Sequence, residues 1–270
     1  CQIPLVLLNF VQQLLDLSGG ILIVFKLCID NPAVFISLGK AMLEPRITPD
    51  FITVDGGEGG TGAAPLEYVN SIGMPLREAL AFVDDCLTGF GLRSQIRVIA
   101  SGKILTGFHL IKNLALGADI CNSGRGMMLA LGCVHSLTCN SNHCPTGVAT
   151  QNPKLFGGLV VKDKALRVEQ FHARTVRATA DIISSVGLHH TSKLNRTHIY
   201  RRTSQEAIRH YDQIFPYMKQ GALLSDTVPD AFKLDCDEAQ SSSFSPQHCL
   251  TDINGDCCTV DRCEQTKKEP

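Results

Sequence analysis

The chain has 270 residues, 44% of them hydrophobic, so it is long enough to bury one large core or two modest ones. Its formal net charge of −1 provides no field that would attract nucleic acid or an anionic membrane, and we expect neither as a partner. Twelve cysteines in a chain of this length, without a visible secretion signal, indicate reduced thiols and a cytoplasmic protein.

Apolar runs and helical segments alternate over the first half of the chain. Each β-branched run predicts a strand, a glycine-rich turn follows it, and a segment of helical periodicity comes next. Asp30 or Asn31 is expected to cap the first of these helices, which Pro32 opens. We expect strands at residues 21–29, 50–55, 96–100 and 118–122, and helices at residues 32–44, 75–90, 106–116 and 127–131.

This alternation predicts an α/β fold with a parallel sheet. An open doubly wound sheet and a (β/α)8 TIM barrel both fit the pattern. The barrel is favoured because Ser-Gly turns follow two successive strands, as in the phosphate sites that barrels build from their last two βα loops. A complete barrel has eight strands, so we expect a partial barrel made of the last four βα units.

The second half of the chain carries less regular patterns. Residues 162–186 predict a long amphipathic helix that ends at Gly187. Residues 199–217 are interpreted as a smaller helical appendage. From about residue 225 the sequence is rich in Ser, Asp and Cys without a hydrophobic period, which predicts little order. The expected organisation is a barrel-like unit at 1–190, a helical appendage at 191–224 and a low-order tail at 225–270.

Three thiols lie close together at Cys133, Cys139 and Cys144, and a proline follows the last. Soft thiolate ligands suit an iron–sulfur cluster. The spacing matches neither the CxxC pairs of zinc ribbons nor a redox CxxC motif. The alternative is that these are three unrelated cysteines in a cysteine-rich chain.

Several motifs together resemble the FMN-binding synthase domain of the glutamate synthase family. They are Gly-Gly-Thr-Gly-Ala-Ala-Pro at 59–65, Gly-Lys-Ile-Leu-Thr-Gly at 102–107, the three-cysteine run, and Cys-Pro-Thr-Gly-Val-Ala-Thr-Gln-Asn-Pro at 144–153. The resemblance covers roughly residues 14–217. It implies an FMN-binding barrel with a 3Fe–4S cluster, in which reduced flavin delivers hydride to 2-iminoglutarate, formed from 2-oxoglutarate and ammonia, to give L-glutamate.

The resemblance also implies roles for individual residues. Cys133, Cys139 and Cys144 become the cluster ligands, and Lys26 becomes the lysine beside the flavin, although a strand-end lysine can simply reach water. Glu58 is a candidate for orienting substrate or relaying a proton, with an exposed loop carboxylate as the alternative. Bare backbone at Gly59, Gly60, Thr61 and Gly62 is expected to approach the flavin or substrate. The expected phosphate cradle consists of Ser101, Gly102, Lys103, Ser123, Gly124 and Arg125, unless Arg125 pairs locally.

The sequence departs from the family in ways that shape the functional hypothesis. Gln2-Ile3-Pro4 does not match the motif after the catalytic cysteine of the glutaminase domain, so ammonia would come from elsewhere, such as a glutaminase subunit. No GxGxxG motif follows a strand, which predicts a separate electron donor, either ferredoxin or an NAD(P)H-oxidising subunit. The alternatives are a non-catalytic fragment or partner subunit that retains the cluster loop, and a flavoenzyme acting on another amino or imino acid.

Overall fold

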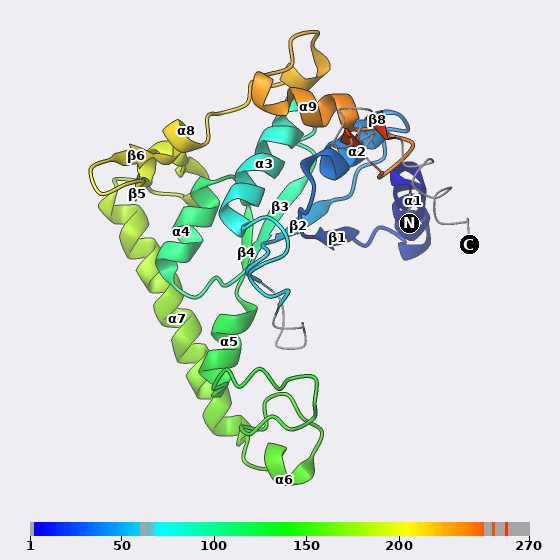
Figure 1. Cartoon of the computed structure of the whole chain (residues 1–270). Helices are drawn as coiled ribbons and strands as arrows, with labels where there is room; N and C mark the ends of the chain where they lie inside the picture. The colour runs from blue at the N-terminus through cyan, green and yellow to red at the C-terminus, as the bar shows by residue number, and fades with distance from the viewer. Residues whose placement is uncertain (1–2, 60–63, 65–66, 246–249, 252–256, 259–270) are drawn as a thin grey trace.

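The structure is a computed structural model, and it describes residues 3–59, 64, 67–245, 250–251 and 257–258 (Figure 1). Its centre is a four-stranded parallel sheet in the order β1-β2-β3-β4. The strand–helix units predicted from the sequence are confirmed. They run through β1 (Val24–Leu27), α2 (Pro32–Leu43), β2 (Phe51–Asp55), α3 (Leu76–Gly89), β3 (Arg97–Ser101), α4 (Gly107–Ala115), β4 (Ile120–Asn122) and α5 (Gly124–Leu131).

Local chemistry explains where these helices begin. The Asn31 side chain accepts a hydrogen bond from the backbone N–H of Ala33, and Pro32 occupies the first turn of α2, where a missing N–H costs nothing. Thr106 caps α4 in the same way by accepting from the N–H of His109 at 3.2 Å. Both caps fix the chain just after it leaves the sheet, so the loop at each strand end has a defined exit.

The two faces of the sheet have different surroundings. Ile52, Val54 and Val98 share one face of the sheet by their register, and all three are fully buried in the main core, to which residues of α2, α3 and α4 also belong. On the other face, Val24 and Ile120 in the two edge strands are 49% and 46% exposed. Parallel sheets normally have both faces covered. Within the part of the chain that the structure describes, only one face of this sheet has a helical layer.

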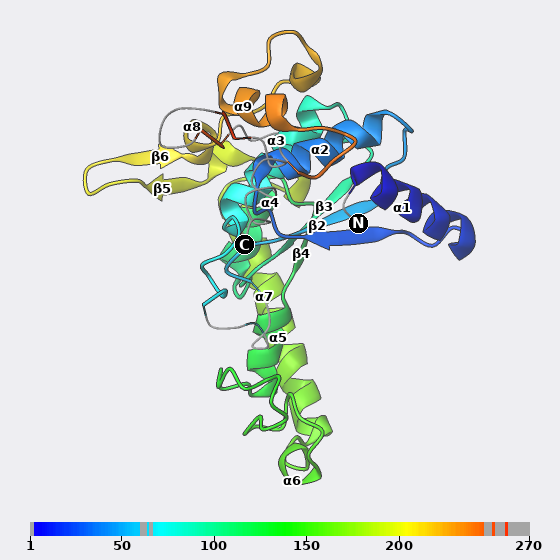
Figure 2. The same cartoon turned by 45° about the vertical axis from the view of Figure 1, so that its right-hand side comes forward.

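An arm extends from the β4 end of the sheet. It consists of α5, the loop that holds the three cysteines, α6 (Pro153–Phe156) and the first turns of α7 (Val161–Ser185), as Figures 1 and 2 show. The prediction of a long helix over 162–186 is confirmed, and Gly187 follows it in the left-handed region with φ of 75°. None of the described helices combines the length and the apolar character needed to cross a membrane.

Two predictions about the later segments are wrong. Residues 199–217 contain a β-hairpin followed by the short helix α8 (Tyr211–Ile214), rather than a wholly helical segment. In the hairpin Tyr200 pairs with His210, and their rings lie 4.0 Å apart. Part of the predicted low-order tail is also ordered. Helix α9 (Asp230–Glu238) packs on α2, and the Lys40 ammonium of α2 donates to the carbonyl groups of Cys236 and Ala239 at the end of α9. The elements are η1 (Thr191–Lys193), η2 (Arg196–His198), β5 (Tyr200–Arg202), β6 (Ile208–His210), α8 (Tyr211–Ile214), η3 (Ala222–Leu224), α9 (Asp230–Glu238), β7 (Leu250–Thr251) and β8 (Cys257–Cys258).

The sequence analysis also missed a helix, α1 (Pro4–Ser18), which packs on α2. Its buried residues Leu8 and Val11 lie one turn apart and face the core. The same run is too short to span a bilayer, and it instead extends the helical layer over the covered face of the sheet.

A buried arginine connects the C-terminal segment to the outer face of α3. Arg196 is fully buried, and its guanidinium donates to Asp85 at 2.8 Å and to Asp84 at 3.1 Å. It also donates to the Phe215 carbonyl at 2.8 Å and lies over the ring of Tyr217. Burial raises the pKa of Asp85 to about 6, although the charge and hydrogen bonds of Arg196 act in the opposite direction.

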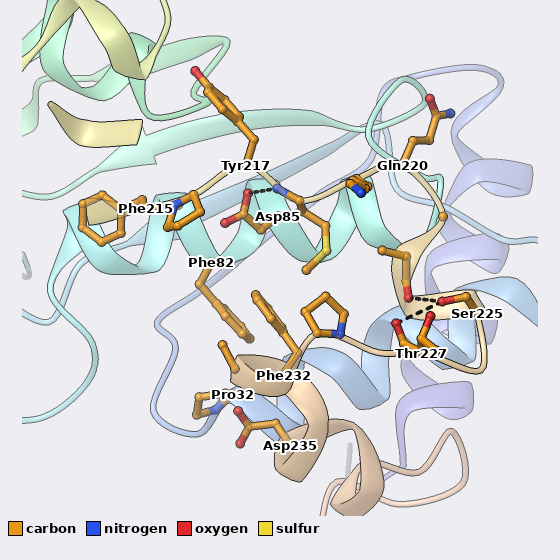
Figure 3. A pocket seen from close by; sticks show the side chains of 18 of the residues that line it. Pro32, Phe82, Asp85, Phe215, Tyr217, Gln220, Ser225, Thr227, Phe232 and Asp235 are labelled. Atoms are coloured by element: carbon orange, nitrogen blue, oxygen red, sulfur yellow. Dashed lines mark hydrogen bonds between the residues drawn. The ribbon is translucent and has the colours of Figure 1, made fainter. Parts of the chain in front are cut away.

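A cavity of about 820 Å³ lies beside this anchor, between α3 and the segment 214–235 (Figure 3). The stacked rings of Phe82 and Phe232 form one wall, and the Asp85 carboxylate, which accepts from the Met218 N–H, forms another. This cavity shares no lining residue with the one at the carboxyl ends of the four parallel strands.

We expect Arg196→Met to lower the free energy of unfolding by about 3–5 kcal/mol, because it leaves Asp85 as a buried charge without its cation. A carboxyl group whose pKa is raised on folding stabilises the fold below its unfolded pKa, and that contribution is lost as pH rises through the folded value. The loss of unfolding free energy in Arg196→Met, measured by chemical denaturation, should therefore be larger at pH 8 than at pH 5.

Arg201→Met is the matched control, because Arg201 is 38% exposed and lies 3.8 Å from the Glu78 carboxylate. Exposed pairs of this kind contribute about 0–1 kcal/mol. Equal losses in the two variants would show that Arg196 does not anchor the segment.

Candidate functional site

The carboxyl ends of the four strands surround a cavity of about 510 Å³. The parallel direction of the strands brings the loops after β1, β2, β3 and β4 to this one edge. Nine of the residues predicted for the site line the cavity: Lys26, Gly59, Ser101, Gly102, Lys103, Gly124, Arg125, Cys133 and Cys139. The sequence analysis missed seven further lining residues: Asp55, Ile104, Asn122, Met128, His135, Leu137 and Ala149.

An ion pair lies at the β1–β2 side of the cavity. The Lys26 ammonium is 2.9 Å from the Asp55 carboxylate, and the two side chains are 60% and 16% exposed. Both residues line the cavity. Lys26 is therefore mostly exposed, but its ammonium is paired with a carboxylate of the neighbouring strand.

The loops after β3 and β4 present bare backbone to the cavity. Gly102 has φ of 144°, a region open to glycine, and an added Cβ would lie 3.2 Å from the backbone nitrogen of Gly56. A Cβ on Gly124 would have nothing within 4 Å, so this residue borders open space at the start of α5. The N-terminus of a helix carries free N–H groups and partial positive charge, which favours an anion.

Two cationic side chains accompany these loops. The Lys103 ammonium contacts the amide oxygen of Asn70, and the Arg125 guanidinium contacts the imidazole of His135. Lys103, His135 and Leu137 all have positive φ, at 46°, 59° and 58°. Such backbone conformations are unfavourable for residues other than glycine, and they cluster at functional sites.

Two of the predicted residues have local partners instead. The Glu58 carboxylate accepts from the Leu76 N–H at 2.9 Å, at the start of α3, and Glu58 does not line the cavity. The Ser123 hydroxyl donates to the Ile104 carbonyl at 2.6 Å and joins the loops after β3 and β4. Neither side chain is placed to act directly on a ligand in the cavity. Gly60, Thr61 and Gly62 lie outside the described residues.

The three cysteines of the run have different environments. Cys133 and Cys139 line the cavity, whereas Cys144 is buried and does not line it. The Cys144 sulfur lies 3.5 Å from the Thr146 hydroxyl, and this hydrogen bond, together with backbone N–H groups led by that of Ala149, lowers the pKa of Cys144 to about 7. Among the described residues, no group of three His, Cys, Asp or Glu side chains lies close enough to hold a metal ion.

A fourth thiol near the site behaves differently. Cys121, in β4, faces the helical layer, and burial raises its pKa to about 12. It is therefore a neutral packing residue, in contrast to Cys144.

Comparison with known proteins adds the family to this geometry. The family profile described as "Conserved region in glutamate synthase" matches residues 4–189. The chain belongs to the glutamate synthase family. The match spans all four strands of the parallel sheet, the glycine-rich loops and the three-cysteine run.

Two relatives show how similar this chain is to other members of the glutamate synthase family. It is 37% identical over 211 residues to the glutamate synthase large subunit-like protein YerD of Bacillus subtilis, covering 78% of this chain and 40% of that protein. It is 36% identical over 145 residues to the archaeal glutamate synthase [NADPH] of Methanocaldococcus jannaschii, covering 54% of this chain and 28% of that protein. The chain thus spans less than half the length of either relative.

Among solved structures, a flavocytochrome b2 variant with sulfite bound aligns with a TM-score of 0.42 at 14% identity. The alignment covers 68% of this chain and 37% of that one. A similarity at this level says nothing further about the site. The names of the relatives indicate an oxidoreductase family.

We expect Gly102→Ala to lower the free energy of unfolding by about 1–3 kcal/mol, because alanine is strained at this φ and its Cβ presses on the loop after β2. A thermal or denaturant melt measures the loss. Gly158→Ala is the control, since its Cβ has no neighbour closer than 3.7 Å and its backbone is not left-handed. A neutral Gly102→Ala variant would mean that these loops are not closely packed.

Proposed function

We propose that this chain is the catalytic barrel portion of a glutamate synthase-type oxidoreductase, which binds FMN in the strand-end cavity and forms L-glutamate from 2-oxoglutarate and ammonia. The observation that carries the proposal is the combination, in one cavity, of bare backbone at Gly102 and Gly124 with the cations Lys26, Lys103 and Arg125. The names of the relatives support the same reaction class.

The residues present fit the cofactor. A volume of about 510 Å³ lies within the range of about 300–1,000 Å³ that small-molecule sites occupy. The phosphate would lie at the start of α5, where Gly124 leaves space and Arg125 supplies charge. Lys103 approaches the same place from the loop after β3. Bound FMN would supply hydride transfer.

The chain itself would bind and orient the reactants. 2-Oxoglutarate carries two carboxylates, which require cations, and Lys26 lies in the cavity at the far side from the proposed phosphate position. A cation near the flavin ring also stabilises negative charge that develops on it. The apolar side chains of Ile104, Met128 and Leu137 would exclude water from the ring.

We interpret the sheet as the last four βα units of a barrel, because a complete one has eight strands and both faces of its sheet covered. The open face with Val24 and Ile120 would meet residues that supply the rest of the wall. Ferredoxin or an NAD(P)H-oxidising subunit would supply electrons, and a glutaminase subunit is a candidate ammonia source.

The 3Fe–4S cluster is a separate part of the proposal. Cys133, Cys139 and Cys144 supply three thiol donors from one loop. As the loop is folded, Cys144 turns to Thr146 rather than to the cavity, and no set of described side chains surrounds a single ion. A cluster would require the three sulfurs to converge on one centre, so we assign the cluster no step in the reaction.

We expect FMN to bind the purified chain, and Arg125→Met to weaken that binding about tenfold, as the loss of one charge-assisted contact of about 1.5–3 kcal/mol implies. Riboflavin lacks the phosphate and should bind wild type and variant equally. Isothermal titration calorimetry measures all four affinities.

The matched control is Arg167→Met, since Arg167 is an exposed arginine of α7 that does not line this cavity. If Arg125→Met weakened FMN and riboflavin to the same extent, Arg125 would not contact the phosphate. If neither flavin bound the wild-type chain, the proposal would be wrong for this chain, and a cluster without flavin would favour the partner-subunit alternative.

We expect anaerobic reconstitution with iron and sulfide to give a coloured protein, and Cys139→Ser to lose the iron and sulfide while FMN affinity stays unchanged. Iron and acid-labile sulfide analysis measures the content. Cys121→Ser is the control because this thiol, in β4, faces the helical layer and does not line the cavity. Equal metal content in the two variants would remove the cluster from the proposal.

A further inference from the structure

We propose that Asp55 is a positioning residue of the cavity: it holds the Lys26 ammonium at the cavity wall and thereby determines how strongly that cation acts on a bound anionic ligand. The inference rests on the proposed function for the identity of that ligand. The inference is argued from the geometry of Lys26, Asp55, Gly59 and Ser101, at the carboxyl ends of β1, β2 and β3.

Asp55 is the fixed member of the ion pair. It is the last residue of β2, pairs in register with Ser101 of β3, and is 16% exposed at its side chain. Lys26 is 60% exposed and extends from β1, the edge strand, where a long side chain has many accessible rotamers. The 2.9 Å contact therefore restricts the lysine far more than the aspartate.

The first turn after β2, at residues 56–59, packs against the Asp55 carboxylate. A Cβ on Gly59 would lie 2.7 Å from Asp55 Oδ1, closer than any real contact allows. The Gly59 N–H donates to the Gly56 carbonyl at 2.7 Å, which fixes the turn. Glycine at position 59 is thus explained by the room that the carboxylate needs, as well as by any approach of a ligand.

The pairing gives the two sides of the cavity different character. On the side of β3 and β4, the cation Lys103 contacts the neutral side-chain amide of Asn70, and Arg125 contacts the His135 ring. On the side of β1 and β2, the cation Lys26 lies against a carboxylate. Asp55 reduces the local positive charge while it keeps the ammonium in place, so the phosphate of a ligand is directed to the other side.

A double-mutant cycle tests this role through FMN affinity. Asp55→Asn in the wild-type background should weaken FMN about threefold, since a partly exposed pair contributes a modest amount and Lys26 is then free to move. In a Lys26→Met background the same change should strengthen FMN binding, because it removes a carboxylate that has lost its cation. Weakening in both backgrounds would show that Asp55 merely supports the loop and would overturn the proposal.

A second measurement does not depend on FMN. Brief labelling with acetic anhydride, followed by mass spectrometry, reports the reactivity of each lysine. Asp55→Asn should raise the labelling rate of Lys26 several-fold and leave that of Lys112, which does not line the cavity, unchanged. An unchanged rate at Lys26 would overturn the positioning role even if FMN binds, whereas a raised rate with no FMN binding would refute the proposed function alone.

Discussion

The common direction of four strands is the constraint on which this structure depends. Because β1 to β4 are parallel and adjacent in chain order, every connecting loop that leaves a carboxyl end emerges at the same edge. Residues as distant in sequence as Lys26 and Cys139 therefore line one cavity. The bare backbone at Gly102 and Gly124 and the charges around it have chemical meaning only because the sheet brings them together.

The remaining elements stabilise that edge from outside. Arg196 ties the C-terminal segment to α3, so the helical layer is held by a buried charge network as well as by apolar contacts. The caps of Asn31 and Thr106 fix the helices that follow β1 and β3. The opposite face of the sheet has no such layer among the described residues. The proposed barrel would therefore need further residues to complete its wall.

Much of the fold could be predicted from the sequence because its signals are local. Alternating β-branched runs and helical periods locate each strand and helix to within a few residues. The sequence predicts helix instead of the hairpin at 200–210, because the two strands are only three residues long and too short to show a period. Helix α9 was missed because it buries only Cys236 and depends on tertiary contacts such as those of Lys40.

The candidate site was predictable in its glycines and cations but not in its pairings. Loop motifs identify Gly102 and Arg125. Nothing in the spacing indicates that Lys26 pairs with Asp55 of the adjacent strand, or that the Glu58 carboxylate accepts from the N–H of Leu76. Register between strands decides such contacts, and it is a property of the assembled sheet. The direction of Cys144 likewise follows from its hydrogen bond to Thr146, which the run of cysteines does not reveal.

Phosphorus-31 NMR of FMN titrated with the chain tests the central claim most directly, because it observes the group that the start of α5 is proposed to hold. The account predicts a shifted, broadened phosphate resonance, and in Arg125→Met the same shift should require about a tenfold higher concentration of the chain. A resonance that stays at the free position while the flavin absorbance shows binding would contradict it.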